Sequence, residues 1–390
     1  MINKKPGVNT ICTHTGELED ERYKGAVSPL YMSTSYAFED VEETRYPRYF
    51  NTPNQVALAK KIAALEHGDR ALVFGSGMAA ITASLLAFVQ QGEHVVFQKS
   101  LYGGTSNLIT EEFSRFGIEY SFAADLSPAA FEAEIRDNTR VIYVETPSNP
   151  LLHLIDLEEI TRLARSRGLV SMIDNTFASP VNQNPIDFGI DVVIHSATKY
   201  MGGHSDILAG AVVASEEHME RIFNLARKFG GNLSDYTVWL LERSIKTMGL
   251  RVRAQNQNAM AVASFLDGNP LVDRVFYPGL ESHPDHELAT RQMSGFGGMM
   301  SFELKGLDPK IFLKYLNLIK PSGSLAGVES TIVSPTQTSH ALLTAEERAD
   351  LGINDGLLRL SIGIEEAEDI IADIEQALEE TRKDQLDVRL

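Results

Sequence analysis

Three things are scarce in this 390-residue sequence: cysteine, positive charge and long apolar runs. The single cysteine, Cys12, cannot form an internal disulfide, which suits a reducing compartment. The first residues lack the apolar segment of a secretory signal peptide, and no apolar run approaches the length that spans a bilayer. We therefore expect a cytoplasmic protein with no membrane partner.

Negative charge dominates, because 35 lysine and arginine residues stand against 53 aspartate and glutamate residues, for a net charge of −18. Proteins that bind nucleic acids need basic patches, so this balance argues against a nucleic-acid partner. It does not argue against a small anionic substrate, since such a ligand needs only a locally positive pocket.

Apolar segments alternate with helical patterns between residues 52 and 247. Continuous apolar strands that alternate with helices are typical of a mostly parallel sheet covered by helices on both faces. The predicted class is therefore α/β. The expected strands cover residues 71–74, 94–98, 118–123, 140–145, 169–173, 192–194 and 207–214, and the expected helices include 78–91, 105–116, 157–167 and 216–227.

Changes in composition and in the spacing of apolar residues along the sequence predict three regions. Residues 1–51 form an irregular arm rich in aromatic side chains, which we expect to pack on another part of the chain or on a second copy. Residues 52–247 form the α/β domain, and residues 248–390 form a smaller α+β domain. A single long helix over 235–266 is expected to join the two domains. The smaller domain is expected to contain strands at 272–276, 299–304 and 357–364 and helices at 309–319, 345–351 and 367–382.

Lys199 lies in the stretch His195-Ser-Ala-Thr-Lys-Tyr-Met-Gly-Gly-His204, between two apolar segments. Burial lowers the pKa of a lysine, and such a lysine can form Schiff bases with carbonyl compounds. The alternative is a lysine at a strand end whose ammonium group extends to solvent.

Gly75-Ser76-Gly77-Met78 follows one expected strand and precedes a helix. Free amides at a helix N-terminus bind phosphate. A dinucleotide site would also need a carboxylate at the end of the next strand, where this sequence has Gln98. We therefore favour a lone phosphate, and the alternative is a tight turn without a ligand.

Polar or aromatic residues follow three other expected strands, where parallel sheets bind ligands: Asp174, Tyr102 and Asn149. Asp174 could hold a ring nitrogen protonated, and Asn149 could hydrogen bond to a ligand; each could equally belong to a turn. Tyr102 could stack on a flat ligand, but taken alone it is better explained as a packed loop tyrosine. Arg359 interrupts an apolar strand and needs an anionic partner, which is either a ligand or an internal carboxylate.

His283 and His286 form a His-Pro-Asp-His motif. Two histidines without a further convergent ligand are weak evidence for zinc, so we predict a structural role for them and no metal site.

These pieces together resemble the Cys/Met-metabolism (transsulfuration) family of enzymes that depend on pyridoxal 5′-phosphate (PLP). The resemblance runs through nearly the whole chain. Its motifs are Tyr46-Pro-Arg48, Ser76-Gly-Met78, Leu101-Tyr-Gly-Gly-Thr105, Glu145-Thr-Pro-Ser-Asn-Pro150, Asp174-Asn-Thr176, Ser196-Ala-Thr-Lys-Tyr200, Ser324-Leu-Ala-Gly-Val-Glu-Ser330 and Arg359-Leu-Ser-Ile-Gly363. It implies the PLP-dependent transferase fold of type I, which is like that of aspartate aminotransferase.

The resemblance also implies a role for each motif. Lys199 would carry PLP as a Schiff base and later move protons, Asp174 would pair with the ring nitrogen, and Tyr102 would stack on the ring. The remaining cofactor contacts would come from Gly77, Met78, Thr176, Ser196 and Thr198, with Tyr46 and Arg48 supplied by a neighbouring subunit. Arg359 would bind the substrate carboxylate, helped by Ser324 and Asn149. The family implies a homotetramer built as a dimer of dimers, with each active site shared across a dimer.

Some positions depart from patterns found within the family. Arg45 stands where several cystathionine-handling enzymes have an acidic residue, Gly323 stands at another such position, and Gly104 stands where methionine γ-lyase has cysteine. Arg45 could instead attract a distal carboxylate of the substrate. The leading prediction is a carbon–sulfur lyase that acts on cystathionine or a related sulfur amino acid. The alternative is a γ-replacement enzyme, either cystathionine γ-synthase or an O-acylhomoserine sulfhydrylase.

Overall fold

The computed structural model describes residues 6–338, 344, 346, 348 and 352–387. The chain divides into two compact units. The first unit contains residues 1–145, 155–202 and 206–250, and the second contains residues 146–154, 203–205 and 251–390.

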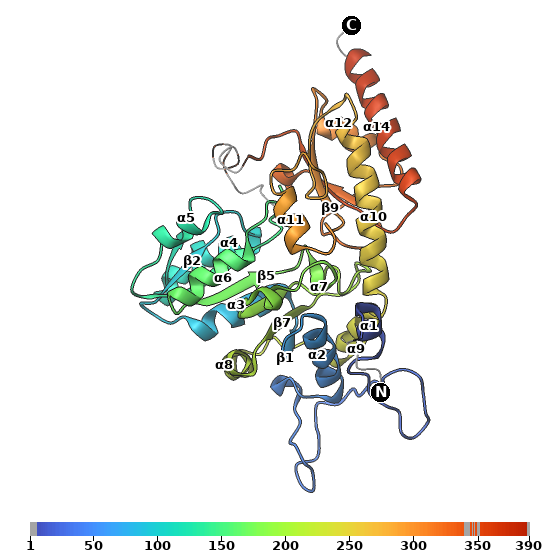
Figure 1. Cartoon of the computed structure of the whole chain (residues 1–390). Helices are drawn as coiled ribbons and strands as arrows, with labels where there is room; N and C mark the ends of the chain where they lie inside the picture. The colour runs from blue at the N-terminus through green and yellow to red at the C-terminus, as the bar shows by residue number, and fades with distance from the viewer. Residues whose placement is uncertain (1–5, 339–343, 345, 347, 349–351, 388–390) are drawn as a thin grey trace. The chain divides into compact units, whose positions relative to one another are not determined.

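A seven-stranded sheet forms the centre of the first unit (Figure 1), with the strand order β1-β7-β6-β5-β4-β2-β3. The strands are β1 (Arg70–Phe74), β2 (His94–Phe97), β3 (Glu119–Phe122), β4 (Thr139–Glu145), β5 (Val170–Asp174), β6 (Val192–His195) and β7 (Gly210–Ala214). Only β7 runs antiparallel to its neighbours among these strands. The predicted mostly parallel sheet is therefore confirmed.

Several helices of this unit begin with a side-chain cap. Thr52 and Gln55 form a reciprocal capping box at the start of α2, and Ser76, Asp156 and Ser215 each accept an N–H bond at the start of their helices. The helices of this unit are α1 (Val8–His14), α2 (Pro53–Leu65), α3 (Gly77–Phe88), α4 (Gly103–Asn107), α5 (Pro128–Ala133), α6 (Leu157–Ser166), α7 (Ser179–Asn182), α8 (Glu216–Phe229) and α9 (Asp235–Ile245).

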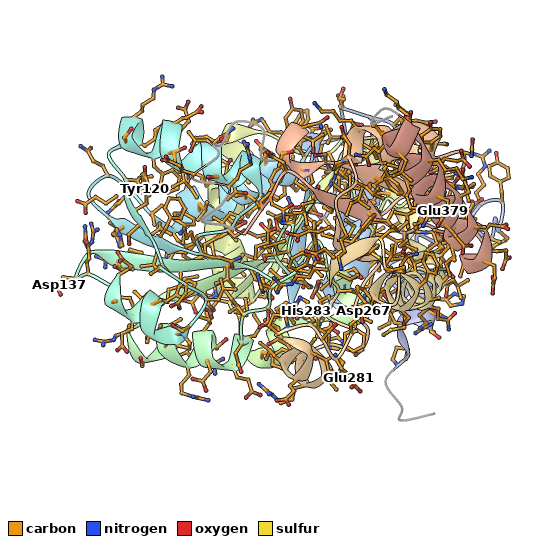
Figure 2. All side chains as sticks on the ribbon, turned by 90° about the horizontal axis from the view of Figure 1, so that it is seen from above. Tyr120, Asp137, Asp267, Glu281, His283 and Glu379 are labelled. Atoms are coloured by element: carbon orange, nitrogen blue, oxygen red, sulfur yellow. The ribbon has the colours of Figure 1, made fainter. Side chains whose placement is uncertain are left out.

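The edge of this sheet is covered by aromatic side chains. Tyr120 on β3, labelled in Figure 2, packs edge-on against Phe122 and Phe113 with ring centroids 5.7 and 6.4 Å apart. The expected helix over 105–116 is irregular, because α4 passes into a π turn and then a 3-10 turn that ends at Phe116.

The predicted single helix over 235–266 is wrong, because it is two helices: α9 and α10 (Met248–Asp267). The amides of Lys246 and Thr247 bond three residues back instead of four, which tightens the chain between the two helices. Gly249 follows at once, and a Cβ there would lie 2.2 Å from Asn9 Oδ1 of α1. The arm thus lies close to the chain at the point where α9 and α10 are separated.

The second unit contains a five-stranded sheet in the order β10-β11-β12-β9-β8. Its strands are β8 (Val272–Phe276), β9 (Met299–Leu304), β10 (Lys320–Pro321), β11 (Thr331–Val333) and β12 (Leu357–Ser361). Besides α10, its helices within the described residues include α11 (His286–Gln292), α12 (Pro309–Tyr315) and α14 (Ala367–Asp387). The short strands β10 and β11 were not predicted. The expected helix over 345–351 lies outside the described residues.

The arm is irregular after α1, as expected, and is tied to α9 by two contacts. Trp239 Nε1 donates to the Ser28 carbonyl at 2.9 Å, and the Ser28 hydroxyl donates to Glu242 at 2.7 Å. Several aromatic side chains of the arm nevertheless remain exposed, among them Tyr23 and Phe38. In the part of the chain that the structure describes, no helix is both long and apolar enough to span a bilayer.

Candidate active site

Lys199 lies in a turn directly after β6, at the carboxyl end of the strand. Its amide donates to the Ser196 carbonyl at 3.0 Å, and the amide of Gly202 donates to the Ala197 carbonyl at 2.8 Å. These two bonds close the turn and fix the lysine backbone. The side chain is half-buried, so it is neither fully enclosed nor extended into solvent.

Asp174 ends the neighbouring strand β5, where it pairs in register with Ile194 of β6. Burial raises the pKa of this carboxyl group above its usual value, although hydrogen bonds from Thr176 and the nearby His195 oppose the shift. The Thr176 amide donates to Asp174 Oδ1 at 2.9 Å, and the Ser196 amide donates to Thr176 Oγ1 at 2.8 Å. Thr176 therefore links the aspartate to the loop that carries Lys199.

The glycine loop lies against the same segment. A Cβ on Gly77 would come within 2.9 Å of Ser196 Cβ, so only glycine allows this approach. Ser76 accepts the amide of Ala79 as the N-cap of α3, and the amides of Gly77 and Met78 lie in the first turn, where they have no intrahelical partner. Such amides suit an anion such as a phosphate group.

Thr198 has a structural role in addition to its expected one. Its hydroxyl donates to the Ala209 carbonyl at 3.1 Å and accepts the Ala209 amide at 3.0 Å. These bonds anchor the lysine loop to the segment that leads into β7. Binding of a phosphate by the Thr198 hydroxyl would require its proton to leave the Ala209 carbonyl.

Tyr102 is 48% exposed, as expected of a residue that could cover a flat ligand. Its amide donates to Glu145 Oε2 at 2.8 Å, and Gln98 Oε1 accepts the Glu145 amide at 2.9 Å. Sequence analysis missed the positioning roles of Glu145 and Gln98, although both residues end expected strands. Gly104 leaves room for the Tyr102 ring, since a Cβ there would lie 2.6 Å from Tyr102 Cε1.

The second unit brings together the three residues expected to bind a carboxylate. Arg359 on β12 is buried; its Nη1 donates to Asn149 Oδ1 at 2.8 Å and its Nη2 donates to the Ser324 carbonyl at 3.2 Å. Ser324 and Ala326 both have left-handed φ angles, 72° and 63°. Ser361, which sequence analysis missed, holds this loop by accepting the Ala326 amide at 2.7 Å.

The three arm residues have partners within the chain. Arg45 donates to the Asn51 carbonyl at 2.6 Å and pairs with Glu43 at 3.2 Å. Arg48 donates to the Arg227 carbonyl at 2.6 Å and lies over the rings of Tyr46 and Tyr49. Tyr46 is 42% exposed. Arg45 also lines a cavity of about 530 Å³ with Tyr31, Tyr36 and Pro53.

The donor set of the first unit fits PLP. The buried Asp174 carboxylate suits a protonated ring nitrogen, the Gly77 and Met78 amides with the Ser196 hydroxyl suit the phosphate, and Tyr102 offers an aromatic face. Lys199 supplies an amine for the aldehyde carbon. These groups come from four separate segments of the chain, each of which ends or follows a strand of the same sheet.

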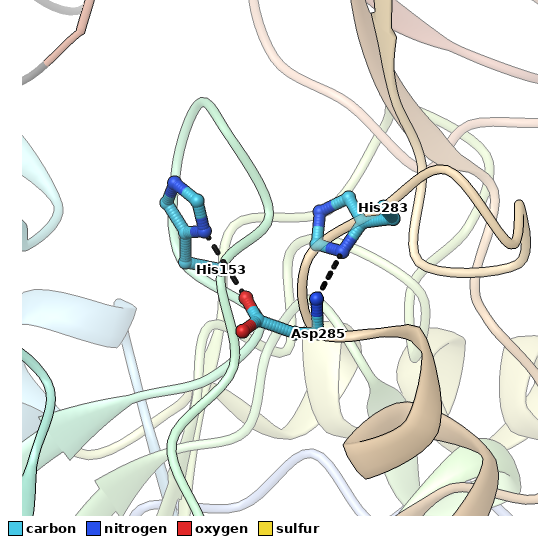
Figure 3. Close-up of side chains that lie close together, drawn as sticks. All are labelled: His153, His283 and Asp285. Carbon is cyan, nitrogen blue, oxygen red and sulfur yellow. Dashed lines mark hydrogen bonds and ion pairs between the residues drawn. The ribbon is translucent and has the colours of Figure 1, made fainter.

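His153, His283 and Asp285 form the one group among the described residues whose composition and spacing could suit a metal, with ligand atoms within 4.8 Å of one another (Figure 3). Each is engaged in hydrogen bonds: His153 Nδ1 donates to Asp285 Oδ2 at 3.1 Å, and His283 Nδ1 accepts the Asp285 amide at 3.1 Å. His286, the other histidine of the motif, bonds the Pro278 carbonyl instead. This cluster therefore ties the 151–154 segment to the start of α11.

Comparisons with known proteins agree with these features. The family model described as "Cys/Met metabolism PLP-dependent enzyme" matches residues 9–379. The cystathionine gamma-lyase of Bacillus subtilis is 44% identical over 376 residues, which cover 95% of this chain and 98% of that protein. The cystathionine beta-lyase of Lactococcus lactis is 42% identical over 93% of this chain and 97% of that protein.

A solved structure shows the same fold. The cystathionine gamma-lyase from Lactobacillus plantarum, complexed with L-serine, superposes with a TM-score of 0.93 at 38% identity, covering 97% of this chain and 100% of that one. The predicted type I fold is therefore confirmed.

Proposed function

This chain belongs to the Cys/Met-metabolism family of PLP-dependent enzymes, and we propose that it is a carbon–sulfur lyase acting on cystathionine or a related thioether amino acid. The products are a 2-oxo acid, ammonium and a thiol. The observation that carries the proposal is the placement of Lys199 and Asp174 at the ends of adjacent strands β6 and β5, in a chain similar over almost its whole length to cystathionine lyases.

Bound PLP supplies an electron-withdrawing ring conjugated to the substrate's α-carbon. The Asp174 carboxylate holds the proton on the ring nitrogen, and Tyr102 covers the ring. The amine of Lys199 accepts the proton from the α-carbon. Its flexible four-carbon stem also lets it reach the β-carbon, as elimination of a γ-substituent requires.

Arg359 binds the α-carboxylate of the substrate. Its buried guanidinium is oriented by Asn149 and by the Ser324 carbonyl, so its planar fork is in place before the ligand binds. Arg45 attracts a carboxylate at the distal end of the substrate. When it binds this carboxylate, Arg45 gives up its partly exposed ion pair with Glu43.

The active enzyme is a cytoplasmic homotetramer in which Tyr46 and Arg48 complete the phosphate site of a neighbouring subunit. The arm exposes several large apolar side chains, among them Tyr23 and Phe38, which supports contact of the arm with a second copy of the chain.

The test is to incubate the purified enzyme with cystathionine and identify the products. Pyruvate with homocysteine demonstrates β-cleavage, and 2-oxobutyrate with cysteine demonstrates γ-cleavage. Absence of both, with turnover of an O-acylhomoserine and a thiol, would replace the lyase by the γ-replacement enzyme.

A further inference from the structure

A buried contact between a histidine and a glutamate adjoins the candidate cofactor site, since its histidine directly precedes Ser196. His195 Nε2 and Glu66 Oε1 are 2.5 Å apart, and their side chains are 2% and 0% exposed. Glu66 follows α2 and His195 ends β6, so 129 residues separate them along the chain. An ionic group this deeply buried is costly unless it is paired, and breaking such a pair leaves an uncompensated charge.

Neutral side chains complete the surroundings of Glu66. Asn175 Nδ2 donates to Glu66 Oε1 at 2.9 Å, and Gln183 Nε2 donates to Asn175 Oδ1 at 2.9 Å. Glu66 Oε2 has no hydrogen-bond partner among the described residues. Among these residues, the contacts of this carboxylate therefore involve Oε1, the oxygen that also contacts His195.

The pair lies next to Asp174 in two ways. Asn175, which bonds Glu66, directly follows Asp174, and the charge of His195 acts on the Asp174 carboxyl group. Asp174 needs such help because burial disfavours its ionised form. Tyr143 of β4 also interacts with this carboxyl group.

We propose that Glu66 and His195 are positioning residues that hold a positive charge beside Asp174 and keep its carboxylate ionised for the ring nitrogen of the cofactor. Glu66 stabilises the charged imidazole, and the imidazole offsets the burial of Asp174. Neither residue touches the cofactor. The inference rests on the proposed role of Asp174 and not on the identity of the substrate.

The test measures cofactor affinity in the full-length protein after removal of PLP. The probes are PLP and its 1-deaza analogue, in which carbon replaces the ring nitrogen. His195→Gln and Glu66→Gln are each expected to weaken PLP binding by about tenfold, because loss of the positive charge raises the pKa of Asp174 further. Binding of the deaza analogue should stay within about twofold of wild type, because its ring offers no nitrogen to the carboxylate.

The matched control is His67→Gln, which removes the exposed His67–Asp187 pair and should change neither affinity. Equal weakening of both probes in the two Gln variants would show a purely structural role, and unchanged PLP affinity would show no role; either result overturns the inference. Glu66→Gln keeps the shape of the side chain, so it decides the matter if His195→Gln fails to fold. No substrate is used, so failure of wild type to cleave cystathionine would leave the inference standing.

Discussion

Arg359 illustrates how single residues prepare this site. The guanidinium is buried, and its bonds to Asn149 Oδ1 and the Ser324 carbonyl hold the planar group in one orientation. Buried cations of this kind bind carboxylates strongly and with defined geometry.

Arg359→Ala is therefore expected to lower kcat/KM for cystathionine by about a hundredfold or more. Arg359→Lys keeps the charge but loses the planar fork, so we expect an intermediate loss. Steady-state kinetics measure both, and the melting temperature checks folding. An unchanged KM in Arg359→Ala would remove this residue from the substrate site.

His283 makes stability depend on pH. Burial lowers its pKa to about 4, partly opposed by the neighbouring Asp285. The folded protein therefore binds the proton less readily than the unfolded chain, whose histidine has an ordinary pKa of about 6.5. The resulting stability is fully present above pH of about 6.5 and is lost as the pH falls towards 4.

Between pH 7 and 4 this histidine is expected to cost the wild type about 3 kcal/mol of unfolding free energy. His283→Asn keeps an acceptor for the Asp285 amide but cannot titrate, so its stability should fall less over the same interval. Denaturant unfolding at a series of pH values measures the difference. Parallel curves for the two proteins would contradict the assignment.

At the scale of elements, one side chain decides where a helix ends. The sequence predicts a helix over 309–319, but α12 ends at Tyr315. Asp373 of α14 accepts the amides of Asn317, Leu318 and Ile319 at 2.8–3.0 Å. Those amides are turned towards Asp373, so they cannot continue the helix.

Asp373→Asn is expected to reduce the unfolding free energy by about 2–3 kcal/mol, since it replaces a charged acceptor and presents an amide group to buried donors. Asp369→Asn is the matched control, because Asp369 lies exposed in the first turn of the same helix. Equilibrium unfolding measures both variants. Equal stability of the two would mean that the three bonds to Asp373 contribute little.

Local patterns made most of the strands and the ligand-binding segments predictable. Apolar runs predict buried strands, and polar residues at their ends, such as Asp174 and Lys199, are visible in the sequence because parallel strands present ligands there. Pairings between distant segments were not predictable. Glu66 lies 129 residues from His195, and Asp373 lies 56 residues from Asn317, so no periodicity links them.

At the scale of the whole molecule, the arm raises the question of which copy uses Tyr46 and Arg48. If each site takes Lys199 from one subunit and Arg48 from its neighbour, the variants Lys199→Ala and Arg48→Ala each lack activity for a different reason. In a mixed dimer, one site carries both defects and the other carries neither. Shared sites in a symmetric assembly therefore predict complementation.

Co-expression of the two differently tagged variants should restore activity in the mixed assemblies, up to about half of their sites. Tandem affinity purification isolates those assemblies, and each homogeneous variant serves as its own control. The expected activity follows from one intact site per mixed dimer and needs no change in either subunit's fold. Mixed assemblies no more active than the parent variants would place Arg48 in the same site as the Lys199 of its own chain, and the proposal of shared sites would then be wrong.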